Sequence, residues 1–394
     1  MNPQEIVIVG MSRTAMGGFQ GDFSSVNAPT LGSVAIKGAL DNANIDPKDI
    51  DQTYMGCVLA AGLGQAPARQ ASIGAGIPMS TPCTTVNKMC GSAMEAVIMA
   101  SNAIAAGSAN IIVAGGMESM SNAPYLLPKM RSGARIGHAQ VMDHMFLDGL
   151  EDVFDKGTLM GVFAEKTAEK YNFSREAQDD FAIASLSRAN EAITKGHFKS
   201  EISPVTVKSR KGDIIIDTDE QPGKARPEKI PTLKPAFAKD GTVTPANSSS
   251  ISDGASAMIL MTRAQADKRG LKPIARIVGH SVHAQEPNWF TTAPVGAMKK
   301  LYEKTGWSDK DVDLYEINEA FAVVTMAAMH DLNISHDKVN VHGGACALGH
   351  PVGSSGARII ITLIAALKTY GKKRGIASLC IGGGEATAVA VEII

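Results

Sequence analysis

The chain lacks the cysteine patterns of a disulfide scaffold or a zinc site. Its 5 cysteines are odd in number, and the sequence contains neither CxxC pairs nor an HExxH segment. Such patterns supply the thiolates and imidazoles that hold zinc, and even numbers of cysteines in short chains supply disulfides. We therefore predict reduced cysteines in a reducing compartment, no metal site and no permanently bound cofactor.

The chain also lacks a large excess of charge of either sign and a long run of apolar residues. The net charge is -1, whereas a nucleic-acid surface needs a strong basic excess. Residues 96–117 carry no charge, but serine, asparagine and glycine interrupt them. A membrane span requires about twenty predominantly apolar residues. We expect neither a nucleic-acid partner nor a membrane, and this segment is typical of a buried helix followed by a buried strand.

The two ends of the sequence carry no recognisable targeting signal. MNPQEIVIVG lacks the basic stretch and the long apolar run of a secretory signal. The final VEII is not a peroxisomal tripeptide. These features predict a cytoplasmic protein.

The sequence contains a duplication. Residues 35–51 read AIKGALDNANIDPKDID, and residues 297–313 read AMKKLYEKTGWSDKDVD, with alanine, lysine and aspartate at matching positions. At the same offset, the Gly-Ser pair after Cys90 matches the pair at residues 353–354, shortly after His350. Two such units related by a pseudo-twofold axis would bring these glycine-flanked turns together, which is a catalytic layout.

A further correspondence is expected between VAGG at residues 113–116 and IGGG at residues 381–384. Buried runs alternate with helical segments in both copies, which predicts an α/β fold with a mixed sheet covered by helices on both faces. The expected strands are the N-terminal EIVIVGMSRT and residues 53–59, 111–114, 314–317 and 377–381, and the expected helices are residues 35–44, 92–106, 297–305 and 353–369.

A region of different character separates the two copies. Residues 120–248 are richer in methionine and proline, with a helical pattern over 165–198 and four prolines within 212–235 that exclude long helices. Large insertions of this kind are natural places for substrate binding. We divide the chain into residues 1–119 for the first part of an N-terminal half, 120–248 for an inserted loop domain, 249–270 for the closing part of that half and 271–394 for a C-terminal half.

Cys90 and His350 are candidate reactive residues because each precedes a helix at a glycine-containing turn. First-turn amides and the helix dipole would stabilise a Cys90 thiolate, although a buried, inert cysteine is the commoner case. A positive helix end would favour the neutral imidazole of His350 that a general base needs. A structural histidine in a constrained loop is the alternative.

Cys380, Gly382 and Asn318 follow or end strands of the second copy. The backbone N–H groups of residues 382–384 could form an oxyanion hole, or these glycines could make a tight turn after a core cysteine. Asn318 could hold a water or a carbonyl, or it could cap the helix that follows. The residues alone leave these alternatives open.

Together these segments resemble the thiolase family. NKMCGSAMEAV, VAGGMESMSNAPY, NEAFA, GGACALGHPVGSSGAR and CIGGGEATA occur in the family's order and spacing across nearly the whole chain. The resemblance implies a five-layered αβαβα thiolase fold made of two duplicated halves, with an inserted loop domain that binds CoA. It also implies a homotetramer built as a dimer of dimers.

The resemblance further implies a ping-pong Claisen condensation, or its reverse, thiolysis. Cys90 matches the nucleophile that takes up the acyl group, His350 the base that deprotonates it, and Cys380 the acid/base that acts on the second acetyl-CoA. His350 and a water held by Asn318 match the site that stabilises the enolate, and the N–H groups of Cys90 and Gly382 match a second oxyanion hole. The implied reaction joins two acetyl-CoA molecules into acetoacetyl-CoA and free CoA.

Contacts with the CoA thioester are assigned on the same resemblance. Ser249 matches a serine near the pantetheine. Lys224 and Arg226 are candidates for the 3′-phosphate, although solvated loop charges are an equally good reading of both. The expected lining of the pantetheine channel and the acyl pocket comprises Phe237, Ala320, Phe321, Leu159, Met160 and Phe290.

The chain departs from the family pattern near the substrate. Leu159 stands where members specialised for acetoacetyl-CoA often carry histidine, and Ser250 ends an NSSS sequence where NASG is common. These departures leave the acyl-chain preference open, so a degradative 3-ketoacyl-CoA thiolase of broader range is the first alternative. A non-catalytic acyl-CoA-binding relative ranks lower, because it would be expected to lose at least one reactive residue.

Overall fold

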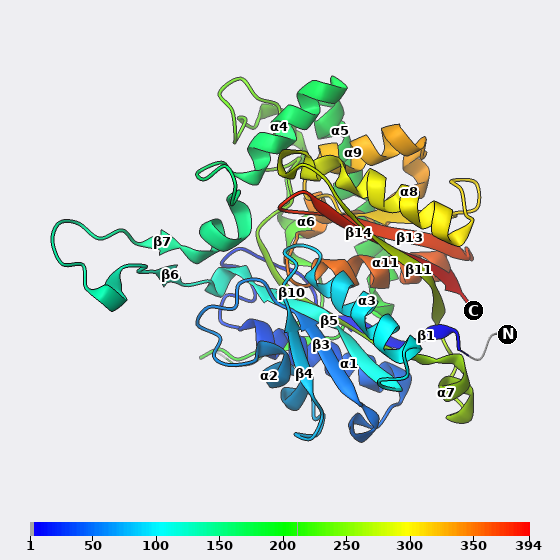
Figure 1. The fold of residues 1–394 in the computed structure, drawn as a ribbon. Coiled ribbons are helices and arrows are strands. Elements are labelled where there is room, and N and C mark those ends of the chain that lie inside the picture. Colours follow the sequence, from blue (N-terminus) through cyan, green and yellow to red (C-terminus); the bar gives the residue numbers. More distant parts are fainter. Residues whose placement is uncertain (1–3, 211) are drawn as a thin grey trace.

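A large mixed sheet organises the chain (Figure 1). The computed structural model describes residues 4–210 and 212–394. Within them, the strands of this sheet are β1 (Ile6–Arg13), β2 (Gly17–Gly18), β3 (Gln52–Gly56), β4 (Cys83–Val86), β5 (Ile111–Ser119), β10 (Ser252–Thr262), β11 (Ala275–Ala284), β12 (Leu314–Ile317), β13 (Arg374–Ile381) and β14 (Glu385–Ile393). They follow the order β12-β13-β14-β11-β1-β10-β5-β3-β4, with β2 beside β10.

The duplication is confirmed by the order of elements. The helices concerned are α1 (Ala28–Ala43), α2 (Pro67–Gly74), α3 (Ser92–Ala105), α8 (Ala293–Thr305), α9 (Ala322–Leu332) and α11 (Ser355–Thr369). Apart from β2, β4, the short α10 (Ala345–Leu348) and the 3₁₀ segments, the order β1-α1-β3-α2-α3-β5-β10 returns as β11-α8-β12-α9-α11-β13-β14. The two halves join where β1 and β11 pair antiparallel, with Val7 opposite Arg276 and Ile8 opposite Ala275.

Five layers follow from how the apolar side chains are distributed. One cluster contains α3 and α11 together with one face of strands from both halves, for example Val97, Ile360, Leu260 and Val389. A second cluster places α1 and α2 on the outer face of the N-terminal strands, and a third places α8 on the outer face of the C-terminal strands, with α9 beside it. In Figure 1 these layers are stacked from α8 at the top to α1 and α2 at the bottom. The expected αβαβα arrangement is confirmed.

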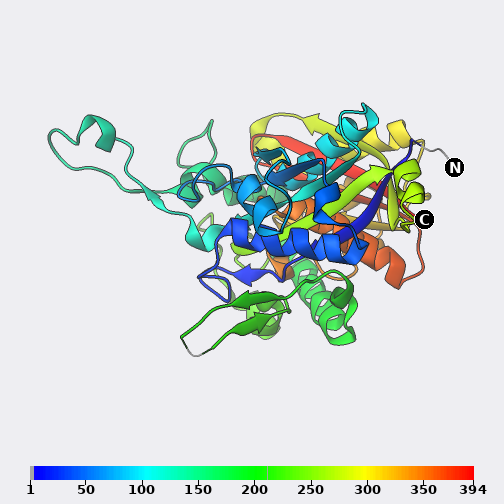
Figure 2. The same ribbon diagram turned by 90° about the horizontal axis from the view of Figure 1, so that it is seen from below.

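The segment between β5 and β10 contributes no described strand to the large sheet. It contains α4 (Met160–Tyr171), α5 (Arg175–Lys195), the short α6 (Glu220–Lys224) and the hairpins β6 (Tyr125–Leu126)–β7 (Met142–Asp143) and β8 (Val205–Val207)–β9 (Ile214–Ile216). Both hairpins stand out from the body in Figure 2. The prolines after α6 limit the chain to one short 3₁₀ turn over residues 227–232, as the sequence indicates. None of the helices in the described part of the chain is long and apolar enough to cross a membrane.

The expected match between VAGG and IGGG is wrong. Gly115 and Gly116 lie inside β5, where a Cβ would overlap the backbone oxygens of Ser256 and Gly353 respectively. Residues 382–384 instead form the turn between β13 and β14, in which Gly383 has a φ of +94°. Glycine therefore allows neighbouring backbone segments to pack closely in the N-terminal half, whereas in the C-terminal half it allows a turn with a left-handed backbone conformation.

Candidate active site

A cavity of about 360 Å³ brings most of the predicted site residues together. Cys90, His350 and Gly382 line it, and so do Leu159, Met160, Phe237, Ser249, Phe290, Ala320 and Phe321. Lys224 and Arg226 line a neighbouring cavity that shares Pro245 and Ser250 with the first. Asn318 and Cys380 are each 1% exposed and do not line the cavity.

The Cys90 turn is built by local hydrogen bonds and close packing. Met89 adopts a left-handed φ of 48°, and the Ser92 hydroxyl donates to the Met89 carbonyl at 2.6 Å while accepting from the Lys88 N–H at 2.9 Å. A Cβ on Gly91 would overlap the side chain of Ile381. The glycine after the cysteine thus lets this turn lie against the end of β13 in the other half.

The Cys90 thiol is not stabilised as a thiolate in the free protein. Burial raises its pKa to about 11, although the N–H groups of Gly382 and of Cys90 itself hydrogen-bond the sulfur and lower the pKa. The amide groups act in the direction expected of the helix end, but desolvation outweighs them. A thiol in this state would need a base in order to act as a nucleophile.

His350 has the protonation state of a base. Its Nδ1 lies 2.5 Å from Ser355 Oγ, and because that hydroxyl donates to the Pro351 carbonyl at 3.0 Å, it accepts the Nδ1 proton. Nε2 is then unprotonated, with Asn318 Nδ2 at 3.4 Å. Burial, followed by the charge of Arg358, lowers the pKa of His350 to about 3. The imidazole is neutral, as the sequence predicts, but burial rather than a helix end is the main cause.

Asn318 does not cap a helix. Helix α9 begins at Ala322 with Phe321 in the capping position, so that reading of Asn318 is wrong. Its amide nitrogen faces His350, and its side-chain oxygen is buried with no hydrogen-bond partner among the described residues. A buried amide oxygen usually has a partner, so Asn318 has the acceptor that the expected water requires.

Cys380 lies behind the reactive end of the cavity. It belongs to β13 and packs in one apolar cluster with Phe290, Phe321 and Met160. Burial, together with the neighbouring Cys90, raises the pKa of Cys380 well above its usual value. Two thiols close enough to interact electrostatically therefore meet at one point of the fold, although residues 90 and 380 are 290 positions apart in the sequence.

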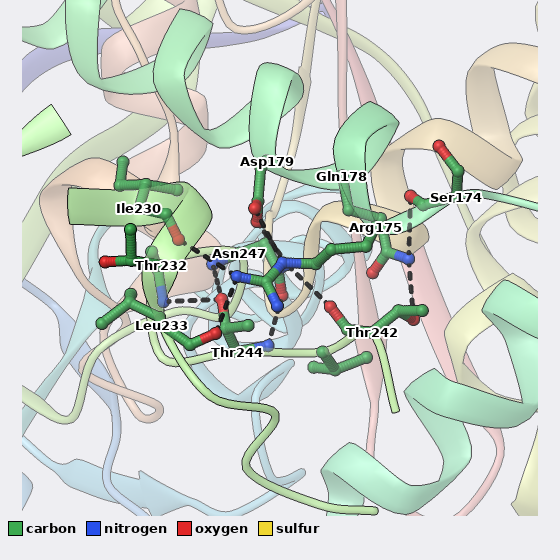
Figure 3. A network of polar contacts seen from close by, with 12 residues as sticks. Ser174, Arg175, Gln178, Asp179, Ile230, Thr232, Leu233, Thr242, Thr244 and Asn247 are labelled. Carbon is green, nitrogen blue, oxygen red and sulfur yellow. Dashed lines mark hydrogen bonds and ion pairs between the residues drawn. The ribbon is translucent and has the colours of Figure 1, made fainter. Parts of the chain in front are cut away.

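A polar network holds the cavity wall in place (Figure 3). Arg175 donates from Nε to Asp179 at 2.7 Å and from Nη2 to the carbonyls of Ile230 and Leu233 at 3.1 and 2.9 Å. The other oxygen of Asp179 accepts from Asn247 Nδ2 at 3.0 Å. The network therefore ties α5 to residues 227–233 and to the wall that begins at Asn247.

That wall continues directly into the NEAFA segment. The Ala322 N–H donates to the Asn247 carbonyl at 2.8 Å, and the Ser249 N–H donates to the Ala320 carbonyl at 3.0 Å. Ser249 and Ala320 both line the cavity. Arg175 and Asp179 thus position cavity residues without lining the cavity themselves. The sequence carries no signal for this role, since the residues that Arg175 and Asp179 hold in place are distant from them in the chain.

Glu118, within the segment VAGGMESMSNAPY, is a further residue of the site that was not predicted from the sequence. Its carboxylate is fully buried at the end of β5, close enough to Cys90 for its charge to raise the thiol pKa. Burial raises the pKa of Glu118 to about 7 in spite of three backbone N–H donors.

The described residues contain no group of three or more histidine, cysteine, aspartate or glutamate side chains that could hold a metal ion.

Comparison with known proteins identifies the family. The model of the thiolase N-terminal domain matches residues 6–264, and that of the thiolase C-terminal domain matches residues 271–393. The chain belongs to the thiolase family. Acetyl-CoA acetyltransferase 2 of Arabidopsis thaliana is 50% identical over 100% of this chain and 98% of its own length. The acetyl-CoA acetyltransferase of Cupriavidus necator is 47% identical over 98% of this chain and 99% of its own length.

Solved thiolase structures have the same fold. The crystal structure of the Bacillus anthracis acetyl-CoA acetyltransferase has a TM-score of 0.96 at 38% identity and covers 99% of both chains. That of an Ascaris suum thiolase in complex with coenzyme A has a TM-score of 0.94 at 42% identity, covering 99% of this chain and 100% of the other. The thiolase fold expected from the sequence is confirmed.

Proposed function

We propose that the protein is an acetyl-CoA C-acetyltransferase that joins two acetyl-CoA molecules into acetoacetyl-CoA and CoA through an acetyl-Cys90 intermediate. The observation that carries the proposal is the convergence of Cys90, His350 and Gly382 at one cavity, with Cys380 behind it. The names of the full-length relatives agree with this activity. CoA thioesters are the substrates, and the coenzyme A complex of the Ascaris relative supports them.

In the first half-reaction, Nε2 of His350 takes the proton of the Cys90 thiol. The sulfur attacks the thioester carbonyl, and the N–H groups of Cys90 and Gly382 hold the developing oxyanion, each such donor being worth about 3 kcal/mol. The C–S bond to CoA then breaks. Cys380 gives its proton to the leaving CoA sulfur and remains as a thiolate.

In the second half-reaction, the Cys380 thiolate takes a proton from the methyl group of the second acetyl-CoA. The protonated His350 and a water held by Asn318 stabilise the enolate oxygen, which agrees with the free acceptor of the Asn318 amide. The enolate carbon attacks the acetyl group on Cys90. The C–S bond to Cys90 breaks, and the Cys90 thiolate recovers its proton from His350.

The neighbouring cavity is proposed as the binding site of the CoA phosphates. Lys224 is already paired with Glu220, whereas Arg226 makes no ion pair with any described residue. Lys229 lines the same cavity and was not identified from the sequence. We therefore propose Arg226 and Lys229 as the main cationic contacts, with Lys224 contributing to the local positive charge. Loss of Arg226 should raise the KM for CoA but not for dephospho-CoA; equal effects on both would contradict a 3′-phosphate contact.

Acyl-chain preference is tested by CoA-dependent cleavage of acetoacetyl-CoA and of a medium-chain 3-ketoacyl-CoA by the purified protein. We expect a strong preference for acetoacetyl-CoA, because Leu159, Met160 and Phe290 crowd the cavity with bulky side chains. Comparable rates would assign the protein to the broader degradative type. Cleavage of neither substrate would favour a non-catalytic acyl-CoA-binding protein.

Replacement of Arg175 by alanine is expected to raise the KM for CoA about tenfold while kcat changes less than about twofold. The reason is that charge-assisted hydrogen bonds to the wall, worth about 1.5–3 kcal/mol each, are lost while the reactive groups stay in place. Arg188→Ala is a matched control, since Arg188 lies on the same helix and donates to the carbonyls of Val339 and His336. A KM that is unchanged in Arg175→Ala, or equally raised in both variants, would contradict the role of Arg175 in positioning the cavity wall.

We also propose a homotetramer built as a dimer of dimers and a cytoplasmic location. The β6–β7 hairpin exposes apolar side chains, and Ile136 at its tip is 90% exposed, which fits a surface covered by another copy. A monomeric mass in light scattering would contradict the assembly.

The cytoplasmic proposal rests on the five free cysteines, and fractionation of the source cells tests it. The domain division given above is likewise proposed, with limited proteolysis within residues 120–248 as its test.

A further inference from the structure

The carboxylate of Glu118 connects two loops from different halves of the fold. Its Oε1 accepts from the Leu59 N–H at 3.0 Å, and its Oε2 accepts from the Val58 N–H at 3.0 Å and from the Gly353 N–H at 2.9 Å. Val58 and Leu59 follow β3 in the N-terminal half. Gly353 lies between His350 and α11 in the C-terminal half.

Both loops lie directly against the nucleophile. Val58, Leu59 and Val352 pack in one apolar cluster, and Met89 and Cys90 pack against it. The position of Val352 depends on Gly353, the next residue in the chain. The hydrogen bond from Gly353 to Glu118 therefore fixes the distance between the turn that contains His350 and the apolar cluster against which Cys90 packs.

Close packing prevents the Gly353 segment from moving closer to the strands of the N-terminal half. A Cβ on Gly56 or on Gly116 would overlap the carbonyl oxygen of Gly353. The carbonyl oxygen of Gly353 thus packs closely against Gly56 and Gly116, and its N–H donates to Glu118. Side chains at either glycine would separate the halves, whereas loss of the carboxylate would release them.

A carboxylate suits this position better than an amide of the same shape. An ionised carboxylate only accepts hydrogen bonds, and its two oxygens supply about four lone-pair sites for the three N–H groups. A glutamine at residue 118 would direct an NH₂ group at one or two of these N–H donors. Burying a charge is costly, and the three backbone N–H donors offset part of this cost by lowering the pKa that burial raises.

We propose that Glu118 is a positioning residue that fixes the His350 turn against the Cys90 turn across the interface of the two halves. The proposal rests on the proposed function for its kinetic consequence only. Glu118 does not line the CoA cavity, and its charge acts on the Cys90 thiol only through space. We therefore expect its loss to lower kcat rather than to change the binding of CoA.

The test compares wild type, Glu118→Gln and Cys57→Ala as full-length proteins. Cys57 is a matched control because its thiol lies 3.8 Å from Glu118 Oε1, so that its loss disturbs the same buried spot without removing a backbone contact. We expect Glu118→Gln to lower kcat for cleavage of acetoacetyl-CoA about 100-fold, with the KM for CoA within about twofold, as a displacement of about 1 Å would cause. Cys57→Ala should resemble wild type in both constants.

Hydrogen exchange supplies a readout that does not depend on activity. In Glu118→Gln, peptides covering residues 57–59 and 350–354 should exchange faster than in wild type and in Cys57→Ala. Unchanged exchange and kcat would overturn the proposal, and so would equal losses in both variants. A wild type that cleaves no substrate, with faster exchange in Glu118→Gln, would remove the proposed function and leave the positioning role supported.

If Glu118→Gln does not fold, Glu118→Asp decides the question. Aspartate keeps the acceptor chemistry but is one methylene shorter, so it cannot reach both loops at once. We then expect about a tenfold lower kcat and faster exchange in one of the two peptides. Wild-type values for both measurements would overturn the proposal.

Discussion

Replacement of Cys90 by alanine is expected to abolish acetyl transfer, with a loss of roughly 10⁶-fold in kcat for the cleavage of acetoacetyl-CoA. The alanine has no atom that can accept the acetyl group, and the neighbouring Cys380 does not line the cavity that Cys90 and His350 line. The measurement is the rate of CoA-dependent cleavage, with circular dichroism to verify folding.

Cys83→Ala is the control for this loss. Cys83 is a partly buried cysteine of β4 in the same half of the fold and does not line the cavity. It should retain the wild-type rate. Substantial activity in Cys90→Ala, or equal loss in Cys83→Ala, would contradict the assignment of Cys90 as the nucleophile.

Replacement of Cys380 by alanine is expected to separate the two half-reactions. The protein should still become acetylated, because Cys90 and His350 remain and CoA can leave more slowly as a thiolate without the Cys380 proton. Condensation should fall about 10³-fold, since no group removes the methyl proton. Label retained on the protein after incubation with radioactive acetyl-CoA measures the first step, and formation of acetoacetyl-CoA measures the second.

Cys346→Ala provides the comparison for Cys380→Ala. Cys346 is another cysteine near the site, with its Sγ 3.8 Å from the carbonyl of Glu319, but it lines only the neighbouring cavity. It should acetylate and condense. Absence of label on Cys380→Ala would show that the two cysteines do not divide the roles as proposed.

Features set by local sequence were predicted correctly. The turn at Cys90 and the helix that follows it are encoded within a few residues, since Gly91 permits the close packing and alanines fill α3. The order of elements in the two halves followed from the repeated pattern at residues 35–51 and 297–313. Cys90, Cys380 and His350 stand out as candidates because each lies beside glycines in a block with a characteristic order.

Features set by burial and distant contacts were not predictable in this way. The pKa of Cys90 depends on how deeply the folded chain encloses it, which the position before a helix does not reveal. Glu118 and Gly353 are 235 positions apart, and Arg358 acts on His350 through space. The mistaken match of VAGG with IGGG has the same origin, because glycines required by packing and by a turn look alike in sequence.

Mass spectrometry of the wild-type protein after incubation with acetyl-CoA alone tests the central claim most directly. The account predicts a gain of one acetyl group on the peptide that contains Cys90, and its removal when CoA is added. No adduct, an adduct on another residue, or an adduct that CoA does not remove would contradict transfer through acetyl-Cys90.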